Sequence, residues 1–227
     1  MYNIYLHFIY LCILCTISNF YTYLLLYLSI FLAAVAVALK EALHPNFTTY
    51  IQQVQENAVS LAQYMQEYDY NIVTNGTSNH IILWNLQNIH ISAIKLEKIL
   101  EKVDISINKN MLINDLSALN PGGVRIGTLA LTTRGMKINE MKLIANFLYR
   151  IVEIAKKIEN YEENLIKIEK KDCNIRENNN STSSITSKKL KDFLLLMDIP
   201  PFVQQLAQIK NEVNALASSF MIPGHKI

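Results

Sequence analysis

The sequence is short of cysteine and of excess charge, and these shortages exclude two common classes of site. Its three cysteines are Cys12, Cys15 and Cys173, and the first two form a C-x-x-C with no second pair and no paired histidines at ligand spacing. A metal or redox centre is therefore not expected. Lysine and arginine total 21 against 19 acidic residues, so no strongly basic face for nucleic acid is expected. The length of 227 residues allows one sizeable core or two modest ones.

The beginning of the chain lacks side-chain charge altogether. No residue from Met1 to Leu39 is charged, and this run is longer than the ~20 apolar residues that span a bilayer. The run is therefore a transmembrane candidate. Two features oppose that interpretation: no lysine or arginine before Lys40 sets an orientation, and Asn19 with several tyrosines interrupts the run. A signal peptide is not favoured, because no small-residue cleavage site is followed by a polar mature start.

Beyond this run, the pattern of apolar residues predicts helices interleaved with short strands. Three-to-four spacing predicts helices over 33–42, 45–69, 92–103, 136–168, 188–197 and 201–220, with the first break at His44-Pro45. Strands are expected on both sides of Asn75-Gly76, in "ISINKN" and at 124–128. Residues 171–187 are polar and low in complexity, so we expect a flexible insertion there.

The stretch "NPGGVRIGTLALTTRG", residues 120–135, places Arg125 on a predicted strand directly after Gly122, Gly123 and one valine. Glycines let the backbone approach a ligand closely, and a guanidinium offers a permanent charge and a planar fork that suits a carboxylate. The stretch therefore outlines a carboxylate-binding site. The plainer alternative is an arginine that is salt-bridged at the edge of a sheet.

Seven motifs, one of which contains this stretch, follow one another along the chain. They are "VAVALKEAL", "YIQQVQENAVSLAQYM", "NIVTNGTSNHIILWNL", "AIKLEKILEKVDISINKN", "SALNPGGVRIGTLALTTRG", "FLYRIVEIA" and "EVNALASSFMIPG". Together they closely resemble the carboxyl-terminal part of serine hydroxymethyltransferase, over about residues 33–227 apart from the insertion. The resemblance implies an α+β fold, the small C-terminal domain of a fold-type I pyridoxal-phosphate transferase. Helices would pack on a small, mainly antiparallel sheet, preceded by an apolar N-terminal helix.

The resemblance also implies ligands and site residues. Arg125 matches the arginine that pairs with the amino-acid carboxylate, and Asn110 matches the asparagine that contacts the folate ring system. Gly122, Gly123 and Gly127 would give the segment its tight backbone. The implied ligands are serine or glycine, tetrahydrofolate as co-substrate and pyridoxal phosphate as cofactor. The implied assembly of the complete enzyme is a homodimer or higher oligomer.

Two further residues are expected to be structural. Arg134 lies in "TTRG", which matches a family motif, and we expect it to cap a helix or form an ion pair. Trp84 lies in a predicted strand, where a core position is expected rather than a stacking surface for a ligand.

The chain departs from the family at several positions. Leu129 stands where the family has proline, and Ile113 and Asn114 stand where a Pro-Gly pair is usual. The Thr-rich stretch ending in His-Lys, whose lysine forms the Schiff base with the cofactor, is absent upstream, and neither Lys40 nor Lys109 stands in that context. No catalytic residue and no metal ligand are therefore assigned.

The sequence thus predicts a C-terminal fragment of serine hydroxymethyltransferase, an enzyme of one-carbon metabolism and glycine biosynthesis. The fragment is expected to be inactive alone, and the complete enzyme to be cytoplasmic, with a mitochondrial location as the alternative. Residues 1–32 look foreign to the family. They are either translated non-coding sequence, which we favour, or a genuine membrane helix. In the second case the chain would be a membrane-anchored, non-enzymatic paralogue that binds an amino acid or a protein partner.

Overall fold

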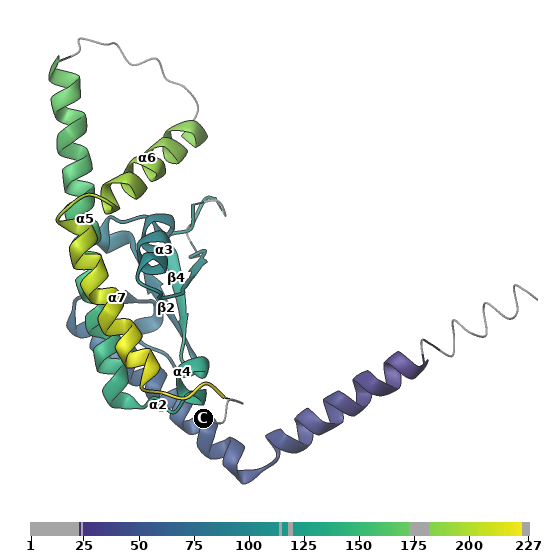
Figure 1. The fold of residues 1–227 in the computed structure, drawn as a ribbon. Coiled ribbons are helices and arrows are strands. Elements are labelled where there is room, and N and C mark those ends of the chain that lie inside the picture. Colours follow the sequence, from purple (N-terminus) through teal and green to yellow (C-terminus); the bar gives the residue numbers. More distant parts are fainter. Residues whose placement is uncertain (1–22, 24, 114, 118–119, 173–181, 224–227) are drawn as a thin grey trace, which may run out of the picture. The chain divides into compact units, whose positions relative to one another are not determined.

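The computed structural model describes residues 23, 25–113, 115–117, 120–172 and 182–223, with side chains described outside 166–172 and 182–189. The chain divides into two compact units, Met1–Ile51 and Gln52–Ile227. Helix α2 (Pro45–Glu67) contains the boundary between them. Figure 1 labels the elements that follow.

In the first unit, the described part of the apolar run is helical over Leu25–Ala42. Its mean hydropathy is 1.9, and by length and composition it could cross a membrane. Its large apolar side chains are exposed. The helix is interrupted at His44 before Pro45 begins α2, as the His44-Pro45 break predicts. The expectations for Cys12 and Cys15 fall outside the described residues.

The second unit combines a small sheet with helices, which confirms the expected α+β class. Its strands are β1 (Asn71–Ile72), β2 (Ile81–Asn85), β3 (Asn108–Asn110) and β4 (Gly123–Gly127). Its further helices are α3 (Ala93–Lys102), α4 (Leu129–Thr133), α5 (Ile138–Asp172), α6 (Thr182–Met197) and α7 (Phe202–Ser218). Two single-turn helices, η1 (Val73–Asn75) and η2 (Gln87–Ile89), lie in the connections.

Two helices are longer than their apolar spacing predicts. Helix α5 ends at Asp172 instead of near Ile168, because its last residues are mostly lysine and glutamate, which favour helix. Helix α6 begins at Thr182 instead of near 188, so serines and threonines of the expected insertion form its first turns. Packing of its apolar end, where Phe193 is fully buried, stabilises the whole helix. Residues 173–181, with Cys173, lie outside the described part of the chain.

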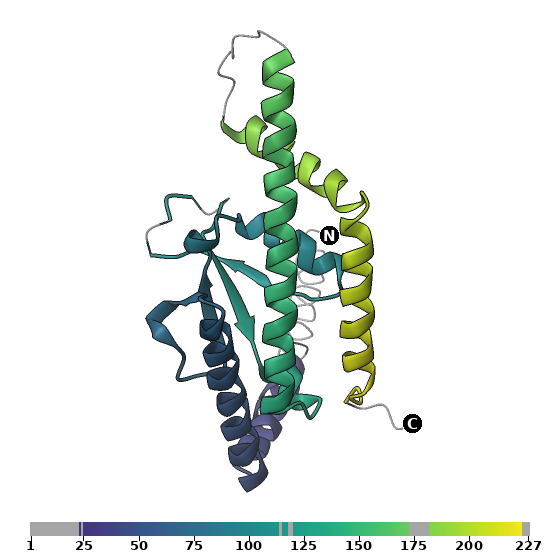
Figure 2. The same ribbon diagram turned by 90° about the vertical axis from the view of Figure 1, so that its left-hand side faces the viewer.

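The four strands form one antiparallel sheet in the order β1-β2-β4-β3. Side chains alternate between its two faces. On one face Ile82, Trp84, Val124 and Ile126 are buried in the core. Figures 1 and 2 show α5 and α7 on one side of this sheet. On the opposite face the strand residues other than Gly123 are exposed or only partly buried, and we call it the open face.

Trp84 occupies the centre of the core, which confirms its predicted structural role. Its side chain is fully buried and its ring centroid lies 4.6 Å from that of Tyr70. Leu61 and Met65, from the apolar stripe of α2, are equally buried in the same cluster. The hydroxyl of Ser92 accepts a hydrogen bond from the Lys95 amide at 3.3 Å and caps α3, which therefore begins where the sequence predicts.

A buried polar network joins α2 to the end of β4. The side-chain amide of Asn57, itself fully buried, donates to the Thr132 hydroxyl and to the Met136 carbonyl, each at 2.9 Å. The Thr132 hydroxyl in turn donates to the Thr128 carbonyl at 2.9 Å, and the Thr128 hydroxyl donates to the Val54 carbonyl at 3.0 Å. Thr128 and Thr132, which follow β4 in the sequence, therefore join α2 to the end of the sheet.

Arg134 connects the segment after α4 to the C-terminal end of α7. Its guanidinium donates to the backbone carbonyls of Ala217 and Phe220 at the end of α7, the second at 2.9 Å. Carbonyls in the last turn of a helix lack the usual i+4 amide partner, and a cationic donor adds a hydrogen bond to them. The capping role expected for Arg134 is confirmed. Gly135 follows at φ 92°, a conformation that glycine adopts without strain.

We expect Arg134→Ala to lower the free energy of unfolding by about 1–3 kcal/mol, because two carbonyls lose a charged donor. Arg134→Lys should recover part of the loss, since an ammonium lacks the planar fork. Lys137→Ala, at an exposed position in the next turn, is the control and should change little. Chemical denaturation of the three variants measures the effect. Equal losses at both positions would show that the cap contributes nothing specific.

A partly buried ion cluster connects three helices on the core side. The ammonium of Lys95 on α3 lies 3.2 Å from Glu159 and 2.9 Å from Glu162, both on α5. It also lies 4.9 Å from the ring centroid of Phe193 on α6. The side chains of the three charged residues are between 8% and 21% exposed. One lysine therefore compensates two carboxylates that have little contact with water.

Candidate functional site

Arg125 stands on the open face of the sheet, in the middle of β4. Its direct neighbours are Leu83 on β2 and Asn108 on β3, so the three side chains form a row across that face. Arg125 is exposed, and its guanidinium has no hydrogen-bond or ion-pair partner among the described residues. Because β4 is paired along both edges, the alternative of a salt-bridged arginine at a sheet edge is wrong.

Glycines flank Arg125 at both ends of β4. Gly123 and Gly127 stand two residues before and after Arg125, so all three share the open face. Neither glycine projects a side chain. The side chain of Leu112 covers Gly123, which is buried, whereas Gly127 is exposed, so a planar ligand or a carboxylate can approach the fork from the Gly127 end of the strand.

Two of the three glycines to which the resemblance assigns a tight backbone are closely contacted by neighbouring residues. A Cβ at Gly122 would lie 2.6 Å from Oδ1 of Asp115, and a Cβ at Gly123 would lie 2.7 Å from Cδ2 of Leu112. A Cβ at Gly127 would make only ordinary van der Waals contact. A larger residue at Gly122 would therefore have to displace Asp115 and one at Gly123 would have to displace Leu112, whereas the space at Gly127 admits a side chain.

Asn110 ends β3 on the same open face. It pairs directly with Gly123, one pleat along β4 from Arg125. Its side-chain amide is partly exposed and donates to the Met111 carbonyl at 2.8 Å, which fixes the orientation of the group. The structure thus brings together two residues that lie far apart in the sequence, a cationic fork and a neutral amide, on one surface.

Asp115 is a residue of this region that sequence reasoning missed. Its Oδ2 accepts hydrogen bonds from the backbone amides of Leu112 and Gly122, both at 2.7 Å. The signal in the sequence was present, because an acidic side chain within a turn-rich connection commonly binds nearby backbone amides. The Asp115 carboxylate therefore links the two ends of the connection between β3 and β4.

Lys109, which lies on β3, is not part of this site. Its direct partner on β4 is the buried Val124, so it belongs to the core face. Its ammonium lies 2.5 Å from Glu97 on α3. Among the described residues, no group of three or more His, Cys, Asp or Glu could hold a metal ion.

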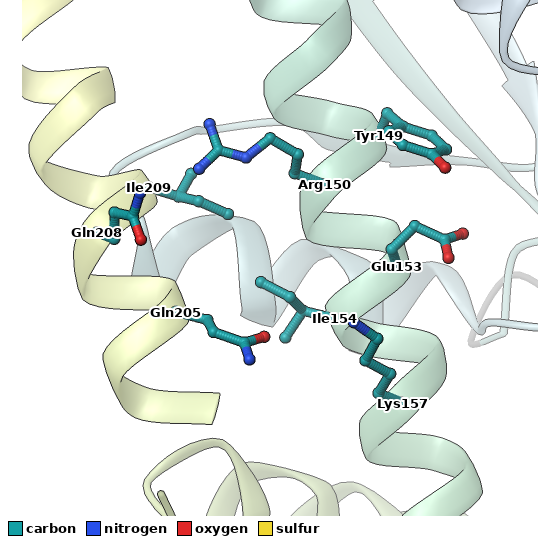
Figure 3. Close-up of a pocket in the computed structure, with 8 residues that line it drawn as sticks. All are labelled: Tyr149, Arg150, Glu153, Ile154, Lys157, Gln205, Gln208 and Ile209. Carbon is teal, nitrogen blue, oxygen red and sulfur yellow. The ribbon is translucent and has the colours of Figure 1, made fainter. Parts of the chain in front are cut away.

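A pocket of about 210 Å³ lies between α5 and α7, away from the strands (Figure 3). Arg150, Glu153 and Lys157 from α5 and Gln205 and Gln208 from α7 contribute charged and amide groups to its lining. Arg150 forms two hydrogen bonds with the carboxylate of Glu212, so its charge is already compensated. Neither residue predicted to bind a ligand lines this pocket.

Comparison with known proteins adds the decisive observation. A family model described as serine hydroxymethyltransferase matches residues 28–148, which include the open face with Arg125 and Asn110. The chain belongs to the serine hydroxymethyltransferase family. The match to serine hydroxymethyltransferase begins inside the helix Leu25–Ala42, ahead of residue 33 where the resemblance was expected to begin.

Three relatives show how much of a serine hydroxymethyltransferase this chain spans. Serine hydroxymethyltransferase 4 of Arabidopsis thaliana is 43% identical over 136 residues, which is 60% of this chain and 29% of the relative. The mitochondrial protein of Candida glabrata is 35% identical over 193 residues, 85% of this chain and 36% of the relative. The cytosolic protein of Neurospora crassa is 33% identical over 195 residues, 85% of this chain and 35% of the relative. The chain therefore spans about a third of the length of these relatives.

Proposed function

We propose that this chain is the C-terminal domain of a transferase that interconverts serine and glycine and passes the one-carbon unit to tetrahydrofolate. The observation that carries the proposal is the position of Arg125. A guanidinium that has no partner among the described residues, on an open sheet face beside the exposed Gly127, is suited to bind a carboxylate from outside the chain. Family membership supports the amino-acid substrate as the source of that carboxylate.

Arg125 and Asn110 have separate roles in this proposal. Arg125 binds the carboxylate of serine or glycine through its planar fork and holds the substrate in register for reaction. Asn110, whose amide oxygen remains available after its contact with the Met111 carbonyl, hydrogen-bonds the ring system of the folate. The domain thus supplies substrate positioning, while the chemistry takes place on groups contributed from elsewhere in the complete enzyme.

The described strand residues beside Arg125 do not fit pyridoxal phosphate, the cofactor of the family. The lysine nearest to Arg125 on the sheet belongs to the opposite face and is paired with Glu97. We therefore derive no step through the cofactor from this chain. In the complete, cytoplasmic enzyme, a separate cofactor domain and a homodimeric or larger assembly supply that part of the site.

We expect the purified chain to form no single, stoichiometric lysine adduct with pyridoxal phosphate. Neither Lys40 nor Lys109 stands in the Thr-rich context of the family lysine, and surface lysines react weakly and without selectivity. Borohydride reduction followed by peptide mapping measures the result. One fully labelled lysine would refute the expectation and would locate a cofactor site within the chain.

A chimera tests the proposed function directly. Residues 33–227 are joined to the cofactor domain of the Arabidopsis thaliana relative, in place of its own C-terminal third. We expect the chimera to exchange serine and glycine in the presence of tetrahydrofolate, whereas each part alone does not. A chimera that folds and binds the cofactor but has no activity contradicts the proposal.

A second candidate function rests on the helix Leu25–Ala42, whose apolar side chains are exposed around its whole circumference. Such a helix is suited to a bilayer, and the chain would then be a membrane-anchored, non-enzymatic paralogue that binds an amino acid or a protein. Sequencing the transcript across the codons for residues 25–40 distinguishes the candidates. Transcripts that begin at Met1, together with a tagged protein that resists carbonate extraction, favour the anchored form. A longer upstream exon joined near Ala33 favours the enzyme.

A further inference from the structure

The connection between β3 and β4 is held at both ends by a single carboxylate. Oδ2 of Asp115 accepts from the Leu112 amide, two residues after Asn110, and from the Gly122 amide, three residues before Arg125, each at 2.7 Å. The Gly122 carbonyl accepts from the Leu86 amide at 3.0 Å. Gly122 is therefore fixed on one side to the carboxylate and on the other side to the end of β2.

The apolar residues next to Asp115 do not hold the connection in place by burial. Ile113 is 99% exposed and Leu116 is 104% exposed, so the side chains on both sides of Asp115 contribute almost no buried area. Beyond the pairing of Asn110 with Gly123 in the β3–β4 ladder, the two hydrogen bonds to Asp115 join the ends of the connection to each other. A charged acceptor makes stronger hydrogen bonds than a neutral one.

The hydrogen bonds to Asp115 hold Leu112, whose side chain packs closely against the backbone of Gly123. A Cβ at Gly123 would lie 2.7 Å from Leu112 and 3.1 Å from the Asn110 carbonyl. Leu112 can pack this closely only while its backbone stays where Asp115 holds it. A shift of Leu112 would be transmitted to Asn110 and, through Gly123, to the start of β4.

We infer that Asp115 is a positioning residue that, together with the β3–β4 pairing, fixes Asn110 relative to Arg125. It does not contact either ligand in this assignment and acts through the backbone of Leu112 and Gly122. The inference rests on the proposed function for the identity of the ligands, a folate at Asn110 and a carboxylate at Arg125. The geometric part can be tested without any ligand.

Amide hydrogen exchange in the intact 227-residue chain tests the geometric part. Asp115→Ala should accelerate exchange at Leu112 and Gly122 by about tenfold or more, and Asp115→Asn, which keeps a neutral acceptor, should have an intermediate effect. The amide of Trp84 in the β2–β4 ladder should be unchanged. Asp198→Ala, which removes an exposed partner of Lys102, is the control. Unchanged exchange at Leu112 and Gly122, or equal acceleration at Trp84, overturns the inference.

Binding of folinic acid, a stable reduced folate, tests the functional part in the same variants. Titration followed on the side-chain amide resonance of Asn110 should show binding weakened about tenfold in Asp115→Ala, partly restored in Asp115→Asn and unchanged in Asp198→Ala. Parent-like binding in Asp115→Ala overturns the positioning role. If the parent chain binds no folate, the proposed function loses support, and the exchange rates still decide whether Asp115 fixes the two strands.

Discussion

Arg125→Ala is expected to abolish saturable serine binding in the chimeric enzyme. Two charge-assisted hydrogen bonds from one guanidinium to a carboxylate contribute about 1.5–3 kcal/mol each in a shielded site, so their loss should cost about 3–5 kcal/mol. That corresponds to a decrease in affinity of about several hundred-fold or more. The visible absorbance of the bound cofactor should persist, because this arginine contacts the substrate and not the cofactor in our proposal.

Two matched variants show whether the carboxylate is bound where we propose. Arg125→Lys should recover only part of the affinity, since an ammonium supplies charge without the planar fork. Arg134→Ala should retain serine binding and lose stability, because Arg134 caps α7 and lies in a different part of the fold. If Arg125→Ala binds serine like the parent, or if Arg134→Ala is the variant that loses binding, the assignment is wrong and the glycine-flanked strand is only scaffold.

Local patterns in the sequence were sufficient for most of the secondary structure. Proline at 45 marks the start of α2, the hydroxyl of Ser92 caps α3, and apolar spacing identifies the long α5, because these signals act within one or two turns of chain. The start of α6 at Thr182 could not be predicted in this way. Serine and threonine have little intrinsic preference for helix, and the turns they form depend on the packing of residues further along.

The arrangement of the site depends on the register between separate strands, which local patterns in the sequence do not predict. Arg125 is next to Leu83 and Asn108 only because β4 lies between β2 and β3, and a one-residue shift would turn its side chain into the core. For the same reason the sequence could not show that Lys109 belongs to the opposite face. The resemblance named Arg125 and Asn110, but that they share one open surface is a property of the pairing.

Lys95→Met is expected to lower the free energy of unfolding by about 3 kcal/mol at neutral pH. Removal of one partner from a buried ion pair leaves uncompensated charge, and here Glu159 and Glu162 would be left facing each other between α3, α5 and α6. Methionine has nearly the same length and can keep the contact with Phe193, so the loss reports charge more than packing. Urea denaturation of parent and variant measures it.

The pH dependence of this deficit has a definite sign. Burial raises the pKa of the Glu159 carboxyl above its ordinary value, against the opposing effect of Lys95, so the folded state is stabilised when Glu159 is protonated and loses that stability as pH rises through the raised pKa. Without the lysine the pKa rises further. The difference between Lys95→Met and the parent should therefore be largest near neutral pH and should shrink on acidification towards about pH 4.

Two comparisons separate the buried charge from the substitution itself. Lys98→Met, on the same helix, removes a lysine whose partner Glu101 is largely exposed, and the unfolding midpoint should change little. Adding Glu159→Gln to Lys95→Met should restore part of the stability and flatten the pH profile, because one of the two uncompensated carboxylates is gone. A Lys95→Met deficit that is independent of pH, or that Glu159→Gln does not relieve, would mean that packing around Phe193 and not charge compensation holds α3, α5 and α6 together.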